Sequence, residues 1–133
     1  MHAYARWLFG IASAFNVAVG AALLFLRPLL LSRLGFDPVQ GTNIIIADLT
    51  GMFIALFGYC YLLVAIDPLR NRPFISVGAI GKLLAIACAV VPWLAGMVQM
   101  QPPPLLAGDL IFALLFIDYL RRTRGAEQFR QKA

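Results

Sequence analysis

Four long apolar stretches, separated by short connections, constrain the fold of this chain more than any other feature of its sequence. They run over residues 7–26, 44–66, 74–98 and 105–120. The hydrocarbon core of a membrane is about 30 Å thick and requires roughly 20 mainly apolar residues in each spanning helix, a length that these stretches approach or exceed. The sequence therefore predicts an all-α integral membrane protein built as a four-helix bundle.

The composition agrees with a membrane protein and leaves no room for a separate soluble domain. Of the 133 residues, 62% are hydrophobic and 13% are charged. Soluble domains are about 45–50% apolar and about 25% charged. All three connections between the predicted helices contain prolines, which end helices, and two of them also carry charges. We therefore expect a single domain over residues 1–133, which ends in a basic tail at 121–133.

The basic residues fall mainly on one side of the predicted bundle. If the amino terminus is cytoplasmic, only Arg27 and Arg33 lie on the outer side. The cytoplasmic side then receives Arg6, Arg70, Arg72, Arg121, Arg122, Arg124, Arg130 and Lys132. The positive-inside rule places both termini in the cytoplasm, which predicts a multi-pass protein of the bacterial inner membrane. We expect the tail to contact membrane lipid headgroups, and we expect no nucleic-acid partner.

Polar side chains within the predicted helices form the candidate site. The candidates for contacting a ligand or carrying protons are Asn16, Asp48, Lys82 and Asp109. Ionisable groups inside a bilayer are costly and commonly mark functional sites, so one interpretation places all four around a shared cavity. A rise of about 1.5 Å per residue puts Asp48 and Asp109 at a similar depth, where they can face each other.

A second interpretation gives these polar groups a structural role only. Lys82 then extends its stem to the cytoplasmic headgroups or pairs with Asp118, and Asn16 joins the same cluster to fix the register of the helices. Asp118 lies nine residues after Asp109, about half a turn away around the helix, so we assign it to this structural role.

Small residues recur at spacings of three or four along the predicted helices and permit close approach of their backbones. The helix predicted over 44–66 carries Gly51, Ala55 and Gly58 in this pattern. The same face continues to Asp48, so we expect its carboxylate to point into the bundle.

The segment RPLLLSRLGF, residues 27–36, has leucines on one side and arginines on the other. One interpretation is a short amphipathic helix in the outer membrane interface, where it can cap a cavity. The other is a continuation of the first helix past Pro28, because transmembrane helices tolerate proline.

Several kinds of site are excluded by the residues that the chain lacks. The only histidine is His2, so the bundle cannot hold a bis-histidine haem or a histidine-rich metal centre. The sequence contains no Gly-rich phosphate loop, no HExxH and no GxSxG. We therefore predict no metal, no cofactor and no catalytic residue, and we regard an enzyme as the less favoured class.

The stretches FNVAVGAALLFLRP, ADLTGMFIALFGY and GDLIFALLFIDYLRR, with the helix count and chain length, resemble the small bacterial DoxX-like membrane proteins. The resemblance spans most of the chain. It implies a binding or complex-forming role, because members of that class are accessory membrane subunits, some of them connected with quinone-linked redox systems. It implies no catalytic residues.

Three classes of function remain open at this point. The first is a non-enzymatic bundle that binds a small hydrophobic molecule such as a lipid or quinone, or that acts as a subunit of a homo-oligomer or a larger membrane complex. The second is a small proton-coupled transporter or channel, and the third is an intramembrane enzyme that uses Asp48 or Asp109 as general acid or base. An apolar cavity, a continuous polar path or paired carboxylates in a closed pocket would distinguish the three.

Overall fold

The fold was obtained as a computed structural model, in which residues 2–125 are described. Over these residues the only regular elements are helices, which confirms the all-α prediction. The helices are α1 (His2–Phe25), α2 (Arg27–Leu34), α3 (Asn43–Ile66), α4 (Arg72–Leu94) and α5 (Leu105–Arg122). The predicted basic tail lies partly outside the described residues, which end at 125.

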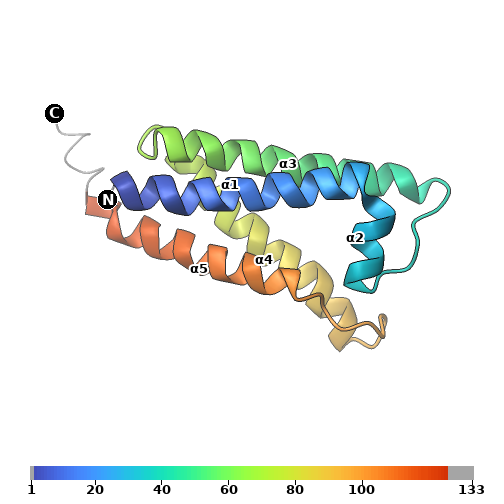
Figure 1. Cartoon of the computed structure of the whole chain (residues 1–133). Helices are drawn as coiled ribbons and strands as arrows, with labels where there is room; N and C mark the ends of the chain where they lie inside the picture. Colours follow the sequence, from blue (N-terminus) through green and yellow to red (C-terminus); the bar gives the residue numbers. More distant parts are fainter. Residues whose placement is uncertain (1, 126–133) are drawn as a thin grey trace.

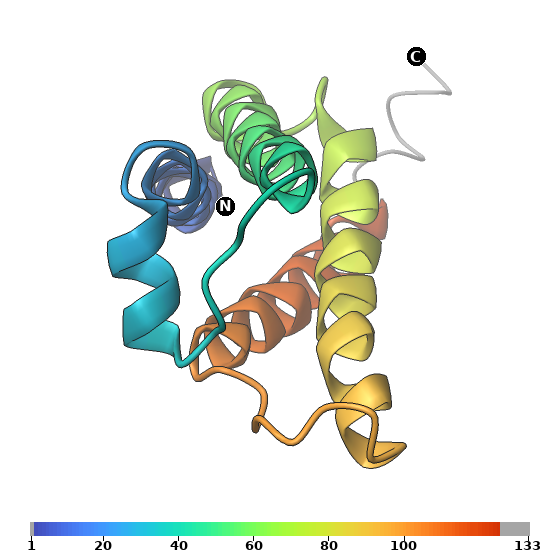
Figure 2. The same ribbon diagram turned by 90° about the vertical axis from the view of Figure 1, so that its right-hand side faces the viewer.

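The four long helices alternate in direction and form two neighbouring pairs (Figure 1). α1 packs mainly against α3, and α4 packs mainly against α5. The start of α1 and the end of α5 lie at the same end of the bundle, which we call the terminal end. The short helix α2 crosses the opposite end, the α2 end, as the view along the bundle shows (Figure 2). This arrangement places the described ends of the chain together, as the predicted topology requires.

Three helices in the described part of the chain, α1, α3 and α4, are long and apolar enough to cross a membrane. α5 has 18 residues, a length of about 27 Å, and it contains Asp109, Asp118, Arg121 and Arg122. It therefore carries more charged residues than any of the other three long helices. Three of the four predicted spanning helices are therefore confirmed as candidates, and the fourth stays a prediction.

Small residues bring the backbones of α1 and α3 into direct contact. A Cβ atom added at Gly20 would lie 2.7 Å from the backbone nitrogen of Ala55 and 2.7 Å from the carbonyl oxygen of Gly51. A Cβ atom added at Gly58 would lie 3.0 Å from the backbone nitrogen of Val17. The close packing predicted for this face of α3 is confirmed, and Gly20 is the residue of α1 that permits the closest approach.

Aromatic side chains connect the two helix pairs in the half of the bundle nearer the terminal end. The ring centroids of Phe9 and Phe116 are 4.8 Å apart, those of Tyr61 and Phe116 are 5.1 Å apart, and those of Phe9 and Tyr119 are 5.4 Å apart. All four residues are buried. Rings at these distances pack as tightly as in a protein core, so the interior is filled at this level.

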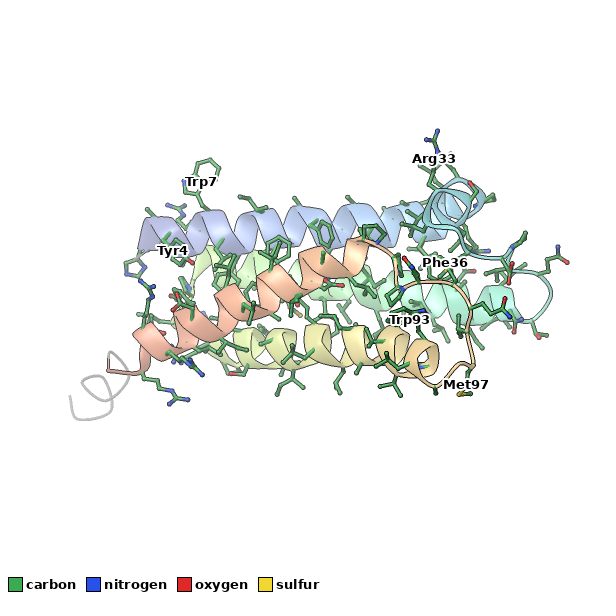
Figure 3. All side chains as sticks on the ribbon, turned by 90° about the horizontal axis from the view of Figure 1, so that it is seen from below. Tyr4, Trp7, Arg33, Phe36, Trp93 and Met97 are labelled. Atoms are coloured by element: carbon green, nitrogen blue, oxygen red, sulfur yellow. The ribbon has the colours of Figure 1, made fainter. Side chains whose placement is uncertain are left out.

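The two tryptophans of the chain lie toward opposite ends of the bundle (Figure 3). Trp7 is near the terminal end and Trp93 is near the α2 end. Tryptophan is enriched where a membrane meets water, so this placement is compatible with a bilayer that lies across the long helices.

The segment after α1 is a separate short helix. At Leu26 the backbone has φ −125° and ψ 30°, which interrupts the helix, and Gly35 ends α2 with a φ of 76°. Proline stands in the first turn of α2, where it costs no hydrogen bond. The first of the two interpretations of this segment is therefore confirmed as to its helical structure, and its position in the membrane interface stays a prediction.

Candidate functional site

A cavity of about 820 Å³ lies between the two helix pairs, toward the α2 end of the bundle. All five helices contribute to its wall, together with the connection between α2 and α3. Leu30, Leu31 and Leu34 of α2 cover it at the α2 end, and Phe36 follows them. Most of the wall is aliphatic or aromatic. The amphipathic segment predicted from the sequence therefore does cap a cavity.

A lysine and an aspartate form an ion pair on the wall of this cavity. The Nζ atom of Lys82 on α4 lies 2.5 Å from Oδ1 of Asp109 on α5. The same ammonium donates a hydrogen bond of 3.1 Å to Oδ1 of Asn16 on α1. The Lys82 side chain is 5% exposed and the Asp109 side chain is 19% exposed. Three of the four candidate residues thus meet at one point, although they come from three different helices.

Three aromatic rings lie near the lysine ammonium. The Nζ atom lies 5.8 Å from the ring centroid of Phe15, 5.5 Å from that of Tyr61 and 5.3 Å from that of Phe112. Ring faces at such distances attract a cation, so the three rings add to the attraction that Asp109 exerts on the ammonium group.

These three aromatic residues were not among the candidates predicted from the sequence. Two of them carry a local signal, because Phe15 is adjacent to Asn16 and Phe112 follows Asp109 by three residues, nearly one helical turn. Tyr61 has no such signal, since it reaches the site from α3, which contributes none of the three polar groups.

The fourth candidate, Asp48, is not part of this cluster. It pairs with Arg27 at the junction of α1 and α2, its side chain is 48% exposed, and it does not line the cavity. The prediction that Asp48 and Asp109 face each other is therefore wrong. The prediction that the Asp48 carboxylate points into the bundle is wrong as well, because its side chain is half-exposed and pairs with Arg27, which follows the end of α1 at Phe25.

Asp118 is also remote from the lysine. Its carboxylate lies 2.7 Å from Nε of Arg122, four residues later on α5, and both side chains are exposed. The alternative in which Lys82 pairs with Asp118 is therefore wrong. The alternative in which Lys82 extends to the headgroups is wrong as well, because its ammonium is buried against Asp109. The structural role assigned to Asp118 agrees with its position as one half of a surface pair on a single helix.

The chemistry of the site follows from this geometry. The polar groups lie at the inner end of an apolar cavity, and the buried aromatic core of Phe9, Tyr61 and Phe116 fills the interior between them and the terminal end. The inner end of the cavity, which we call its floor, is thus formed by Asn16, Lys82 and Asp109, and most of its wall is apolar. Among the described residues that line the cavity, Asp109 is the one carboxylate. Such a site can hold an amphipathic molecule with its polar end at Lys82.

Comparisons of the sequence with protein-family models and with curated proteins, and of the structure with solved structures, give no match. The resemblance to the DoxX-like membrane proteins therefore stays a prediction. The cavity and its ion pair are the grounds on which a function can be proposed.

Proposed function

We propose that this chain is a non-enzymatic membrane protein that binds a small amphipathic molecule, such as a lipid or quinone, in the cavity between its two helix pairs. The observation that carries the proposal is the combination of an apolar cavity of about 820 Å³ with a buried polar cluster at its inner end. Ligand sites typically have volumes of about 300–1,000 Å³, mostly apolar walls and a few convergent polar groups.

The ion pair itself supports a binding role. Replacing a buried ion pair by apolar residues of similar size is often neutral or stabilising, so stability alone gives little reason to keep a charge pair among apolar helices. Lys82 and Asp109 are placed where a ligand in the cavity would touch them. A role in orienting that ligand accounts for both their burial and their position.

The membrane topology is part of the same proposal. All four long helices span the bacterial inner membrane, with the terminal end in the cytoplasm. The basic side chains of the terminal end and the positive-inside rule support this orientation. α5 can serve as the fourth span because Asp109 is neutralised by Lys82, while Asp118 and Arg122 pair near its cytoplasmic end. The sequence resemblance to DoxX-like proteins supports a binding role in this setting.

The other two classes have less support from the geometry. Proton-coupled transport requires a polar route on both sides of Lys82, and the packed aromatic core occupies the side toward the terminal end. General acid–base chemistry by Asp48 is disfavoured because this residue lies outside the cavity, and Asp109, which lines it, is held in the ion pair with Lys82. Simple binding needs neither feature.

The test is to fill the cavity and ask whether a bound molecule is lost. Ala85 lines the cavity, whereas Ala87, two residues along the same helix, does not. We expect native mass spectrometry of protein extracted from membranes to show a bound amphiphile on the parent and on Ala87→Phe, and none on Ala85→Phe. Thermal unfolding checks that both variants fold. A parent without a bound molecule, or equal occupancy in the two variants, would refute the proposal.

A further inference from the structure

The wall of the cavity is electrically balanced. Among the described residues that line it, Lys82 is the one cation and Asp109 is the one anion, and each is the other's ion-pair partner at 2.5 Å. The remaining polar groups of the wall, among them Asn16 and Thr50, are uncharged. A ligand that enters the cavity therefore meets no net charge.

We infer that the cavity selects an uncharged amphiphile whose polar end is a hydrogen-bond acceptor, such as a carbonyl or an ether, and rejects amphiphiles that carry a net charge. This inference rests on the proposed function and names the class of ligand. It follows from what each kind of ligand would do to the pair.

A charged ligand would leave one member of the pair without a partner. An anionic head would attract Lys82 and leave the Asp109 carboxylate uncompensated among apolar walls. A cationic head would do the same to the lysine. A buried charge that loses its partner is strongly unfavourable, so either ligand adds a net charge that the site cannot neutralise. An uncharged ligand leaves the pair intact.

The lysine still has a donor to offer an uncharged ligand. An ammonium group carries three N–H bonds, and two of them are directed to Asn16 and Asp109. The third can donate to an oxygen of the ligand. Phe15 and Tyr61 line the cavity within 5.8 Å of the ammonium and supply apolar surface for the carbon atoms next to that oxygen.

The experiment uses three long-chain probes of the same chain length that differ only in the head: a methyl ketone, an alkyl sulfonate and an alkyl trimethylammonium. Their binding to the full chain is measured in nanodiscs of uncharged lipid, after subtraction of binding to empty nanodiscs. We expect the ketone to bind about tenfold or more tightly than either charged probe, a difference of about 1.4 kcal/mol or more.

Two variants should change the selectivity in opposite directions. Asp109→Asn keeps a hydrogen-bond acceptor for Lys82 but removes the negative charge, so the sulfonate should gain about tenfold or more in affinity. Lys82→Gln removes the positive charge, so the trimethylammonium probe should gain instead. Asp118→Asn, which removes an acid of the same helix away from the cavity, serves as the control and should leave the order of the three probes as in the parent.

The outcomes separate this inference from the proposed function. If the parent binds a charged probe as tightly as the ketone, or if neither variant changes the order, the inference is overturned while binding in the cavity stands. If the parent binds none of the three probes, the proposed function fails and the inference fails with it.

Discussion

The substitution Lys82→Met tests whether the ion pair is formed as described. It removes the cation that pairs with Asp109, whose side chain is 19% exposed, and it also removes the hydrogen bond to Asn16. Breaking a buried pair by removing one partner typically costs about 3–5 kcal/mol. We expect the variant to lose about 3–5 kcal/mol of unfolding free energy.

A double-mutant cycle shows whether this loss belongs to the pair. Lys82→Met combined with Asp109→Leu removes both charges, so most of the lost stability should return. The matched control combines Lys82→Met with Asp118→Leu. Asp118 pairs with Arg122 on the surface, so these two effects should simply add.

The measurement is denaturant-induced unfolding of the purified protein in detergent, followed by circular dichroism. A single variant as stable as the parent would show that Lys82 has no buried partner. A double variant with Asp109→Leu that is as unstable as the sum of the single variants would show that the partner is another group. Either result would refute the ion pair at the floor of the cavity.

Three further predictions concern the packing of α1 on α3, the Arg27–Asp48 ion pair and the membrane topology. Gly20→Ala should destabilise the protein by about 1–3 kcal/mol in the same unfolding assay, because the new methyl group would collide with the backbone of α3; an unchanged midpoint would contradict that contact. Arg27→Met should cost at most about 1 kcal/mol, because its partner Asp48 is half-exposed; a loss as large as that of Lys82→Met would contradict this. Cysteines placed beside Arg72 should react with a membrane-impermeant reagent only from the cytoplasm and those beside Pro103 only from outside, and the reverse pattern would overturn the orientation.

The helices themselves could be predicted well from the sequence because apolar length and proline-rich connections are local signals. The helix predicted over 44–66 is α3, which begins at Asn43 and ends at Ile66. The third prediction, over 74–98, was less accurate at its end, because α4 ends at Leu94 and Gly96 then turns the chain with a φ of 71°. A left-handed residue of this kind is not visible in hydropathy.

The partner of Lys82 could have been found from the sequence by counting from one end of the bundle. Lys82 lies ten residues after the start of α4, about 15 Å from the terminal end, and Asp109 lies thirteen residues before the end of α5, about 20 Å from the same end. The long stem of lysine covers this difference.

The position of Asp48 could not be predicted in the same way. Its spacing from Gly51 and Ala55 predicted a carboxylate inside the bundle, but the side chain is half-exposed. Its partner is decided by the interruption of the helix at Leu26. There α2 turns away from the axis of α1, and Arg27 is brought to the Asp48 carboxylate. The cavity has the same origin, because α2 covers it only after that turn. Pro28 indicates that a new helix can begin here, but it does not fix the direction in which that helix runs.

The most direct test of binding in the cavity is to map where a bound amphiphile lies. A long-chain methyl ketone with a photoreactive diazirine near its head would be equilibrated with the protein in nanodiscs, activated by light, and its attachment sites identified by mass spectrometry. We predict attachment at cavity residues such as Asn16, Thr50 and Ala85. Attachment only at outward-facing side chains such as Ile80 and Leu84 would show that the ketone stays in the surrounding lipid, and it would contradict binding in the cavity.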